Sequence, residues 1–159
     1  MTSRLQRHLL SQKEAKEFKE KVRNLYGVDL TSDKIEIGKE KRQLFYFVDD
    51  VLSFFGENLT PTLCFLLKHR TNLPWVKIDE GAVKAVARGA DLYAPGVVEH
   101  SGDVKPGRLL VVKTKLDQPV AIMNTVEGAD EALKNKRGKV ASALHWIGDD
   151  MWNLCRSKS

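Results

Sequence analysis

The sequence contains few of the residues that build metal sites and disulfide frameworks. Its 159 residues include 2 cysteines and 4 histidines, and neither Cys64 nor Cys155 has a second cysteine or a histidine beside it at metal-site spacing. Two cysteines are also too few for the disulfide framework of a small secreted domain. We therefore expect two reduced thiols and no bound metal.

Long hydrophobic runs are missing as well. Although 42% of the residues are hydrophobic, no run approaches the roughly 18 to 20 apolar residues that a helix needs to cross a bilayer. The opening stretch MTSRLQRHLL is basic and lacks the apolar core that secretory signals carry. These absences predict a soluble, globular protein that stays in the cytoplasm and away from membranes.

Motifs of the common enzyme classes are not present either. The chain has no GxxxxGK[ST] phosphate-binding loop, no GxSxG nucleophile turn and no pair of histidines at HxH or HxxxH spacing. Adjacent carboxylates occur at Asp49 with Asp50 and at Asp149 with Asp150, but aspartate is common in turns, and we assign both pairs to turns. We expect a protein that is not an enzyme and needs no cofactor, while an RNA-modifying activity in the first half remains an alternative.

Charge is the first positive signal. The chain has 26 Lys and Arg against 21 Asp and Glu, which gives a formal net charge of +5. A mild basic excess suits an anionic partner such as RNA without requiring one.

The first half of the chain has the pattern of a small α+β unit. Ser11 followed by Glu14 is a capping box, after which apolar residues recur at helical spacing until Gly27. The segments KIEI, QLFYFV and VLSFF are short, rich in β-branched and aromatic residues, and broken by turn residues, which is typical of strands in hairpins. The aromatic hairpin supplies either the core or, as an alternative, a sticky surface for a protein partner.

A short buried helix is expected after these strands. Thr60 is the predicted N-cap and Pro61 the first helical residue. Its apolar residues Leu63, Leu66 and Leu67 are expected to face inward.

The second half begins near Pro74 and has a different order of elements. Asp79 can cap a helix, EGAVKAVAR, on which Lys84 and Arg88 project together at i, i+4 spacing. The later segments YAPGVVEH, GRLLVVKTK, QPVAIMNT, GKVASALHWI and MWNL have the pattern of strands, and the EGAD segment that of a turn. The sequence predicts an α+β fold whose second domain is a small, curled, barrel-like sheet.

The stretch ARGADLYAPGVVEH contains two glycines and a proline, so its backbone can adopt conformations that other residues disfavour. Gly89 is placed to end the helix in a left-handed conformation, and Pro95 with Gly96 is a turn pair in which Gly96 takes a positive φ. Bare main chain beside Lys84 and Arg88 could accept phosphate and ribose closely. We call residues 89–96 the ledge.

The stretch VKIDEGAVKAVARGADLYAPGVV resembles the opening of the PUA domain, an RNA-binding module of pseudouridine synthases and archaeosine transglycosylases. Together with PTLCFLLKH and GDDMWNL, it is similar to the malignant T-cell-amplified sequence family of translation machinery-associated proteins. The resemblance implies a small N-terminal α/β (pre-PUA) domain over residues 1–74. It implies a PUA domain, a pseudo-barrel of mixed strands with short helices, over residues 75–159.

The resemblance also implies a function. Relatives act on the small ribosomal subunit in initiation, reinitiation and recycling, where they handle tRNA near its acceptor end, in eukaryotes together with a partner that carries an initiation-factor-like domain. The implied partners are therefore tRNA or rRNA, the small subunit and an initiation-factor-like protein. The alternative is an accessory RNA-binding protein in tRNA or rRNA modification, in the pseudouridine or archaeosine pathways.

In PUA domains RNA lies against the first helix, the glycine loop that follows it and a late strand. Tyr93 and Met123 either offer a flat apolar surface to a base or belong to the core. The resemblance assigns RNA binding to Lys84, Arg88, Gly89, Ala90, Asp91, Leu92, Tyr93, Pro95, Gly96, Ile122, Met123 and Asn124.

Overall fold

The computed structural model describes residues 6–157 and divides into two units. The first unit holds the chain up to Asn72 and again from Asp150, and the second holds Leu73–Asp149. The chain therefore returns to the first unit after it has completed the second. This return differs from the expected assignment of residues 150–159 to the second domain. No helix among the described residues is long and apolar enough to cross a membrane.

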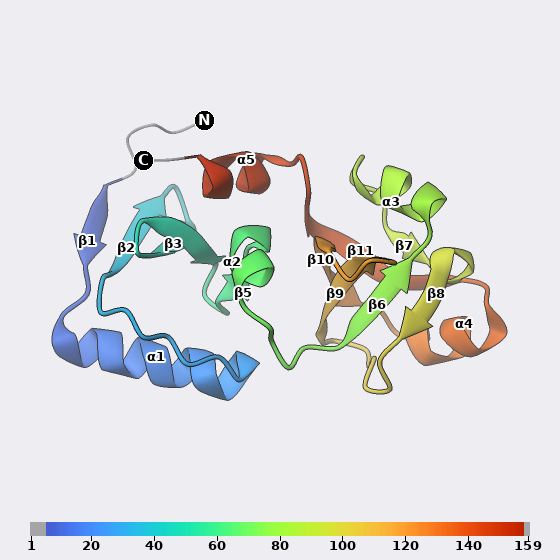
Figure 1. Ribbon diagram of the computed structural model, residues 1–159, viewed down its shortest axis with the longest axis horizontal. Helices are drawn as coiled ribbons and strands as arrows, with labels where there is room; N and C mark the ends of the chain where they lie inside the picture. The colour runs from blue at the N-terminus through green and yellow to red at the C-terminus, as the bar shows by residue number, and fades with distance from the viewer. Residues whose placement is uncertain (1–5, 158–159) are drawn as a thin grey trace. The chain divides into compact units, whose positions relative to one another are not determined.

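The first unit combines a five-stranded antiparallel sheet, in the order β1-β2-β3-β4-β5, with three helices (Figure 1). Its elements are β1 (Arg7–Leu9), α1 (Gln12–Tyr26), β2 (Ile35–Glu40), β3 (Gln43–Val48), β4 (Val51–Phe55), β5 (Thr60–Pro61), α2 (Leu63–Lys68) and α5 (Asp150–Arg156).

Helix α1 begins and ends as the sequence predicts. The Ser11 backbone N–H donates to Glu14 Oε1 over 2.9 Å and the Glu14 N–H donates to Ser11 Oγ over 3.1 Å, which confirms the capping box. Gly27 ends the helix with φ 69°. The buried face of α1 packs on the sheet, where the Phe18 ring lies 5.1 Å from that of Tyr46.

The aromatic hairpin of β3 and β4 forms the core of the first unit. Its phenylalanines are buried and Leu44, Tyr46 and Val48 are half-buried, so the hairpin supplies the core and does not present an exposed aromatic surface. Asp49 and Asp50, with φ 50° and 68°, form the turn between the strands, which confirms the turn prediction. The buried side chains are Phe45, Phe47, Leu52, Phe54 and Phe55.

Helix α2 starts two residues later than predicted. Thr60 and Pro61 pair with β4 as strand β5, and the N-cap is Thr62, whose Oγ1 accepts from the Phe65 N–H over 3.2 Å. Leu67 was expected to face inward but 46% of its surface is exposed, because Leu63, Phe65 and Leu66 form the buried face of the helix. Pairing with β4 is favoured over an earlier helix start because it provides hydrogen-bond partners for the backbone of this segment.

A disulfide bond joins Cys64 on α2 to Cys155 on α5. The expectation of two reduced thiols is therefore wrong, and so is the expected strand at MWNL, which lies in helix α5. The cause is long-range: the two cysteines stand 91 positions apart, and only the return of the chain at Asp150 brings them together. The bond and the packing of α5 on α2 and β4 place the C-terminal segment in the first unit.

The second unit is a six-stranded sheet in the order β7-β11-β10-β9-β6-β8. Strands β6 and β9 are parallel and the other neighbours are antiparallel, so the sheet is mixed, as expected for a PUA half-barrel. The EGAD segment was expected to be a turn, but its last residues begin helix α4. The elements are β6 (Trp75–Ile78), α3 (Glu80–Val86), β7 (Leu92–Tyr93), the 3-10 helix η1 (Ala94–Gly96), β8 (Val97–His100), β9 (Leu109–Thr114), β10 (Pro119–Thr125), α4 (Ala129–Asn135) and β11 (Lys139–Trp146).

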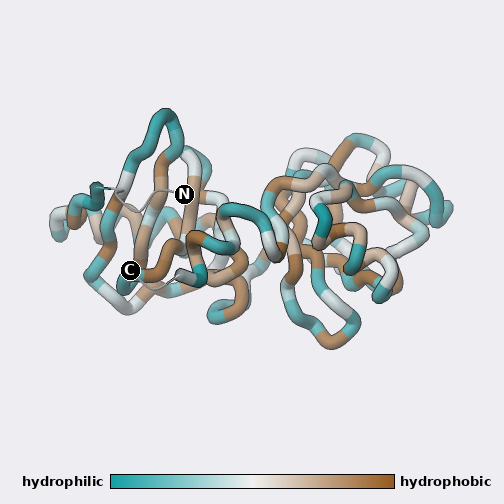
Figure 2. Tube along the Cα trace, turned by 90° about the horizontal axis from the view of Figure 1, so that it is seen from above, coloured by the Kyte–Doolittle hydropathy of each residue, from teal (hydrophilic) through white to brown (hydrophobic). Residues whose placement is uncertain are grey.

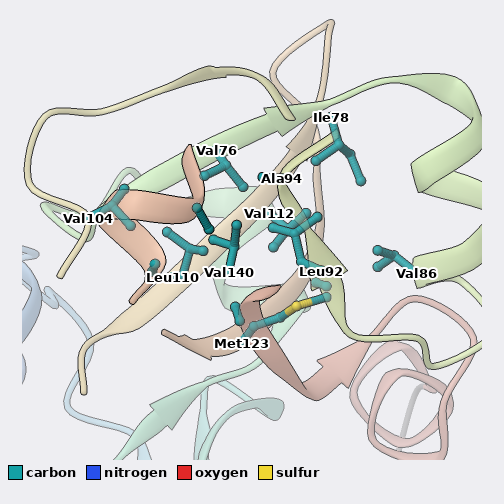
Figure 3. Close-up of a cluster of buried hydrophobic side chains, with 14 of the residues drawn as sticks. Val76, Ile78, Val86, Leu92, Ala94, Val104, Leu110, Val112, Met123 and Val140 are labelled. Atoms are coloured by element: carbon teal, nitrogen blue, oxygen red, sulfur yellow. The ribbon is translucent and has the colours of Figure 1, made fainter. Parts of the chain in front are cut away.

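The core of the second unit is aliphatic. Figure 3 shows side chains from β6, β7, β9, β10 and β11 pointing toward one another, among them Ile78, Leu92, Val112, Met123 and Val140. Figure 2 shows hydrophobic and hydrophilic stretches along the trace. The central strands β9 and β10 carry runs of consecutive buried residues, Leu110–Val112 and Val120–Met123, so both of their faces are covered. The sheet and its short helices confirm the predicted α+β class. β7 is the strand at one edge of this sheet.

Candidate nucleic-acid interface

Two exposed cations lie on and just after helix α3, which ends at Val86, two residues before the predicted end at Arg88. Asp79 caps the helix by accepting the Ala82 N–H at Oδ1 over 2.8 Å, which confirms the predicted N-cap. Val86 is buried against the sheet, whereas Lys84 and the following Arg88 are exposed. Neither cation forms an ion pair with any residue in the range 6–157. Both are therefore available to an anionic ligand.

Gly89 begins the ledge and needs to be glycine for two reasons. Its φ is +89°, as predicted, which a side chain rarely allows. A Cβ at this position would also lie 2.8 Å from Cζ2 of Trp146 on β11. The ledge therefore starts in close contact with the end of β11.

From Gly89 the ledge follows β11 along the edge of the sheet. The Ala143 N–H donates to Asp91 Oδ1 over 2.8 Å, and Tyr93 stands opposite Lys139 in the antiparallel ladder. Among the described residues β7 pairs with β11 alone, so its other side, at Leu92–Tyr93, is an edge of the sheet. An open edge offers backbone groups to a ligand.

The carboxylate of Asp91 is used internally. The Ala143 N–H first, and then Lys139, whose Nζ lies 3.0 Å from Oδ2, hold the pKa of Asp91 below its usual value. Its negative charge is partly balanced by Lys139, which reduces the repulsion of a phosphate at this edge. Asp91 thus fixes the ledge to β11.

Gly96 is required for a reason other than the predicted one. Its φ is not positive, because residues 94–96 form the 3-10 helix η1 instead of a turn with a left-handed residue. The constraint is close packing: a Cβ on Gly96 would lie 2.7 Å from Cβ of Ala82 on α3. The Gly96 carbonyl also accepts the Asp79 N–H over 3.0 Å, which joins η1 to the start of α3.

The two apolar candidates for base stacking have different environments. Tyr93 exposes 53% of its surface, whereas Met123 is fully buried in the core. A base cannot stack on Met123, and the same holds for Ile122, which is also fully buried. β11 separates their strand β10 from the ledge, so β11 is the late strand that lies beside residues 89–93.

The structure therefore brings together the part of the predicted site that precedes residue 97 and separates the part on β10. Exposed are Lys84, Arg88, Tyr93, Pro95 and Asn124; half-buried are Gly89, Ala90, Asp91 and Gly96; buried are Leu92, Ile122 and Met123. Asn124 faces solvent but lies on the strand beyond β11. The basic run KNKRGK, residues 134–139, leads into β11 and was not part of the predicted site. Among residues 6–157 no group of His, Cys, Asp and Glu could hold a metal ion.

Comparison with known proteins agrees with this architecture. Residues 74–147 match the family model of the PUA domain, and residues 6–69 match a model described as a domain of unknown function (DUF1947). Translation machinery-associated protein 20 of Saccharomyces cerevisiae is 30% identical over 125 residues, which cover 73% of this chain and 68% of that protein. This chain belongs to the family of translation machinery-associated protein 20. The PUA domain makes it an RNA-binding protein.

Two relatives match this chain over nearly its whole length, and a third matches it only in part. An uncharacterized protein of Methanocaldococcus jannaschii is 28% identical over 162 residues, covering 93% of this chain and 96% of that protein. A conserved PUA domain protein from Thermoplasma acidophilum has a TM-score of 0.84 at 28% identity, covering 94% of this chain and 99% of that one. The similarity to the probable tRNA pseudouridine synthase B of Thermococcus kodakarensis, 34% identity over 94 residues, covers 59% of this chain and only 27% of the synthase.

Proposed function

We propose that this protein binds tRNA or small-subunit rRNA through its PUA domain during the initiation or recycling of translation. The single observation that carries the proposal is the pair of cations, Lys84 and Arg88, that have no ion pair among residues 6–157 and precede the sheet edge at Leu92–Tyr93. The family membership supports a role in the translation machinery. The small ribosomal subunit and an initiation-factor-like protein are the proposed partners, and the cytoplasm is the proposed location.

The arrangement suits a polynucleotide on chemical grounds. Lys and Arg contribute affinity through phosphates, while main-chain N–H and C=O groups of an open edge can approach phosphate and ribose closely. The exposed ring of Tyr93 adds a stacking surface for an unpaired base. Together these groups support the binding of a single-stranded segment or an end of a folded RNA.

The test is to reverse both charges on α3. We expect Lys84→Glu with Arg88→Glu to weaken the binding of bulk tRNA more than tenfold at roughly 0.15 M salt, because each lost phosphate contact lowers the salt slope by about 0.7. Fluorescence anisotropy measures the affinity and a thermal unfolding curve verifies the fold. Lys13→Glu with Lys21→Glu on α1 makes the same charge change in the first unit and serves as the matched control. Equal losses in both variants would refute the site, because net charge alone would explain them.

A second candidate function is supported by the partial similarity to a tRNA pseudouridine synthase. In that case the chain would accompany a modifying enzyme instead of a ribosome. Sedimentation of the intact protein with purified small ribosomal subunits distinguishes the two: co-sedimentation that the α3 variant loses supports the translation role. Retention of a pseudouridine synthase in a pull-down, without co-sedimentation, favours the modification role.

A further inference from the structure

We propose that the turn between α4 and β11 is a second phosphate-binding element for the same RNA. Its cations are Lys134, Lys136 and Arg137, which we call the basic turn. The inference rests on the proposed function, because it extends the binding site from α3 along the ledge to a part of the domain that the sequence analysis did not include.

Backbone pairing places the basic turn directly beside the end of the ledge. Tyr93 stands opposite Lys139 in the ladder, and the Ala94 N–H donates to the Gly138 carbonyl over 2.9 Å. Residues 136–138 therefore precede the residue that pairs with Tyr93, whose side chain is exposed. In Figure 1 the turn joins α4 to β11 on the side of the second unit away from α3.

The cationic side chains of the basic turn neither close helix α4 nor form ion pairs with residues in the range 6–157. The C-terminus of α4 is closed by main chain, since the Lys136 and Arg137 N–H groups both donate to the Ala132 carbonyl. Lys134, Lys136 and Arg137 are exposed, and none forms an ion pair with a residue in the range 6–157. The adjacent Lys139 differs, because it is paired with Asp91.

A helix C-terminus attracts cations through the partial charges of its last carbonyls, and this gives a purely structural reason for some of these residues. The attraction falls off within the last turn of the helix, so one or two cations are enough to satisfy it. It does not account for a run of free cations that continues past the helix to the start of β11. It also does not account for the exposed aromatic ring that lies next to them.

The spacing fits a single RNA strand. Residues 89–93 run antiparallel to β11 from Trp146 to Lys139, and five extended residues span at most about 14 Å. Arg88 precedes one end of this segment and the basic turn adjoins the other. A strand with stacked bases rises about 3.4 Å per nucleotide, so roughly four nucleotides would connect the two sets of cations. Tyr93, at the basic-turn end, is placed to receive an unpaired base.

The experiment removes charge without reversing it. Lys136→Gln with Arg137→Gln is compared with Lys13→Gln and Lys21→Gln, a control that takes two exposed cations from α1, in the intact chain. Bulk tRNA binding is followed by anisotropy between roughly 0.05 and 0.3 M KCl. We expect the turn variant alone to lose about tenfold in affinity at roughly 0.15 M salt and about 1.4 in the slope of log K against log salt, the effect of two phosphate contacts.

The outcomes distinguish a failure of the basic turn from a failure of the proposed function. A loss in the α3 variant with no loss in the turn variant beyond the control overturns the basic turn and leaves the proposed function intact. A loss in the turn variant with none in the α3 variant supports the turn and refutes the α3 site. Binding by the unmutated protein of neither tRNA nor small-subunit rRNA overturns both.

Two further measurements keep the proposal falsifiable. The single variant Arg137→Gln, which should lose about 0.7 in slope, replaces the double variant if thermal unfolding shows that the double variant does not fold. Poly-glutamate serves as a probe for an acidic protein partner. If the turn variant loses poly-glutamate binding but retains tRNA binding, the turn serves such a partner and the RNA proposal is overturned.

Discussion

Gly89 and Gly96 bound the ledge, and each is fixed by a different physical constraint. Gly89 has φ +89° and lies against Trp146, so both its backbone conformation and its surroundings exclude a side chain. Gly96 has an ordinary φ, but a Cβ would lie 2.7 Å from Ala82. The sequence pattern indicated the first constraint, because helix termination by glycine is local. It could not indicate the second, because Ala82 is brought near by the fold.

Tyr93 allows the clearest test of a single residue. We expect Tyr93→Ala to weaken tRNA binding by roughly 1 to 3 kcal/mol if a base stacks on the ring. Tyr93→Phe keeps the ring, and its affinity should equal that of the unmutated protein. Anisotropy titrations with bulk tRNA measure both. A loss of the same size in the phenylalanine variant would mean that the hydroxyl, and not stacking, contributes the affinity.

At the scale of elements, the ledge is held to the sheet at both of its ends. The Ala143 N–H and Lys139 fix Asp91 to β11, and Gly138 accepts the Ala94 N–H at the other end. These contacts attach the ledge to β11 at two points through groups of the protein itself. α3 belongs to the same assembly, because Asp79 at its N-cap donates its backbone N–H to Gly96.

This packing predicts a large effect of a small substitution. Gly89→Ala should lower the free energy of unfolding of the second unit by about 2 kcal/mol or more, since it combines an unfavourable φ with a clash against Trp146. Gly102→Ala is the control, because a Cβ there meets nothing within 4 Å. Urea unfolding followed by circular dichroism measures both variants. Equal stability of the two would contradict the close contact of Gly89 with β11.

At the scale of the whole molecule, the chain forms its second unit as an insertion in the first. The first unit is completed only when α5 returns at Asp150, and the disulfide between Cys64 and Cys155 secures that return. The second unit has its own aliphatic core and contains neither cysteine. The disulfide is therefore expected to act on the stability of one unit only.

Reduction of the disulfide tests this arrangement. Treatment with dithiothreitol should lower the stability of the first unit by about 2 to 4 kcal/mol, the usual range for one bond. The value should fall at the lower end of that range, because the folded second unit keeps the enclosed loop short. Hydrogen exchange measured by mass spectrometry should accelerate in α1, β3 and β4 but not in β9, β10 and β11.

The paired variant Cys64→Ser with Cys155→Ser is the control for this experiment, since it should exchange at the accelerated rates with or without dithiothreitol. Acceleration in both units of the unmutated protein would show that they unfold as one cooperative body. The finding would contradict the independent stability of the second unit.

The sequence alone determined the features that depend on neighbours along the chain. The capping box at Ser11, the N-cap at Asp79, the left-handed glycines Gly27 and Gly89, and the short β-branched and aromatic segments act over a few residues, so the α+β class could be predicted from them. Only the tertiary structure decided which apolar residues face solvent, as Tyr93 and Met123 illustrate, and which cysteine meets which. These outcomes depend on contacts between distant segments, and the free energy of such a contact is set by the partner that the fold supplies, which no local pattern specifies.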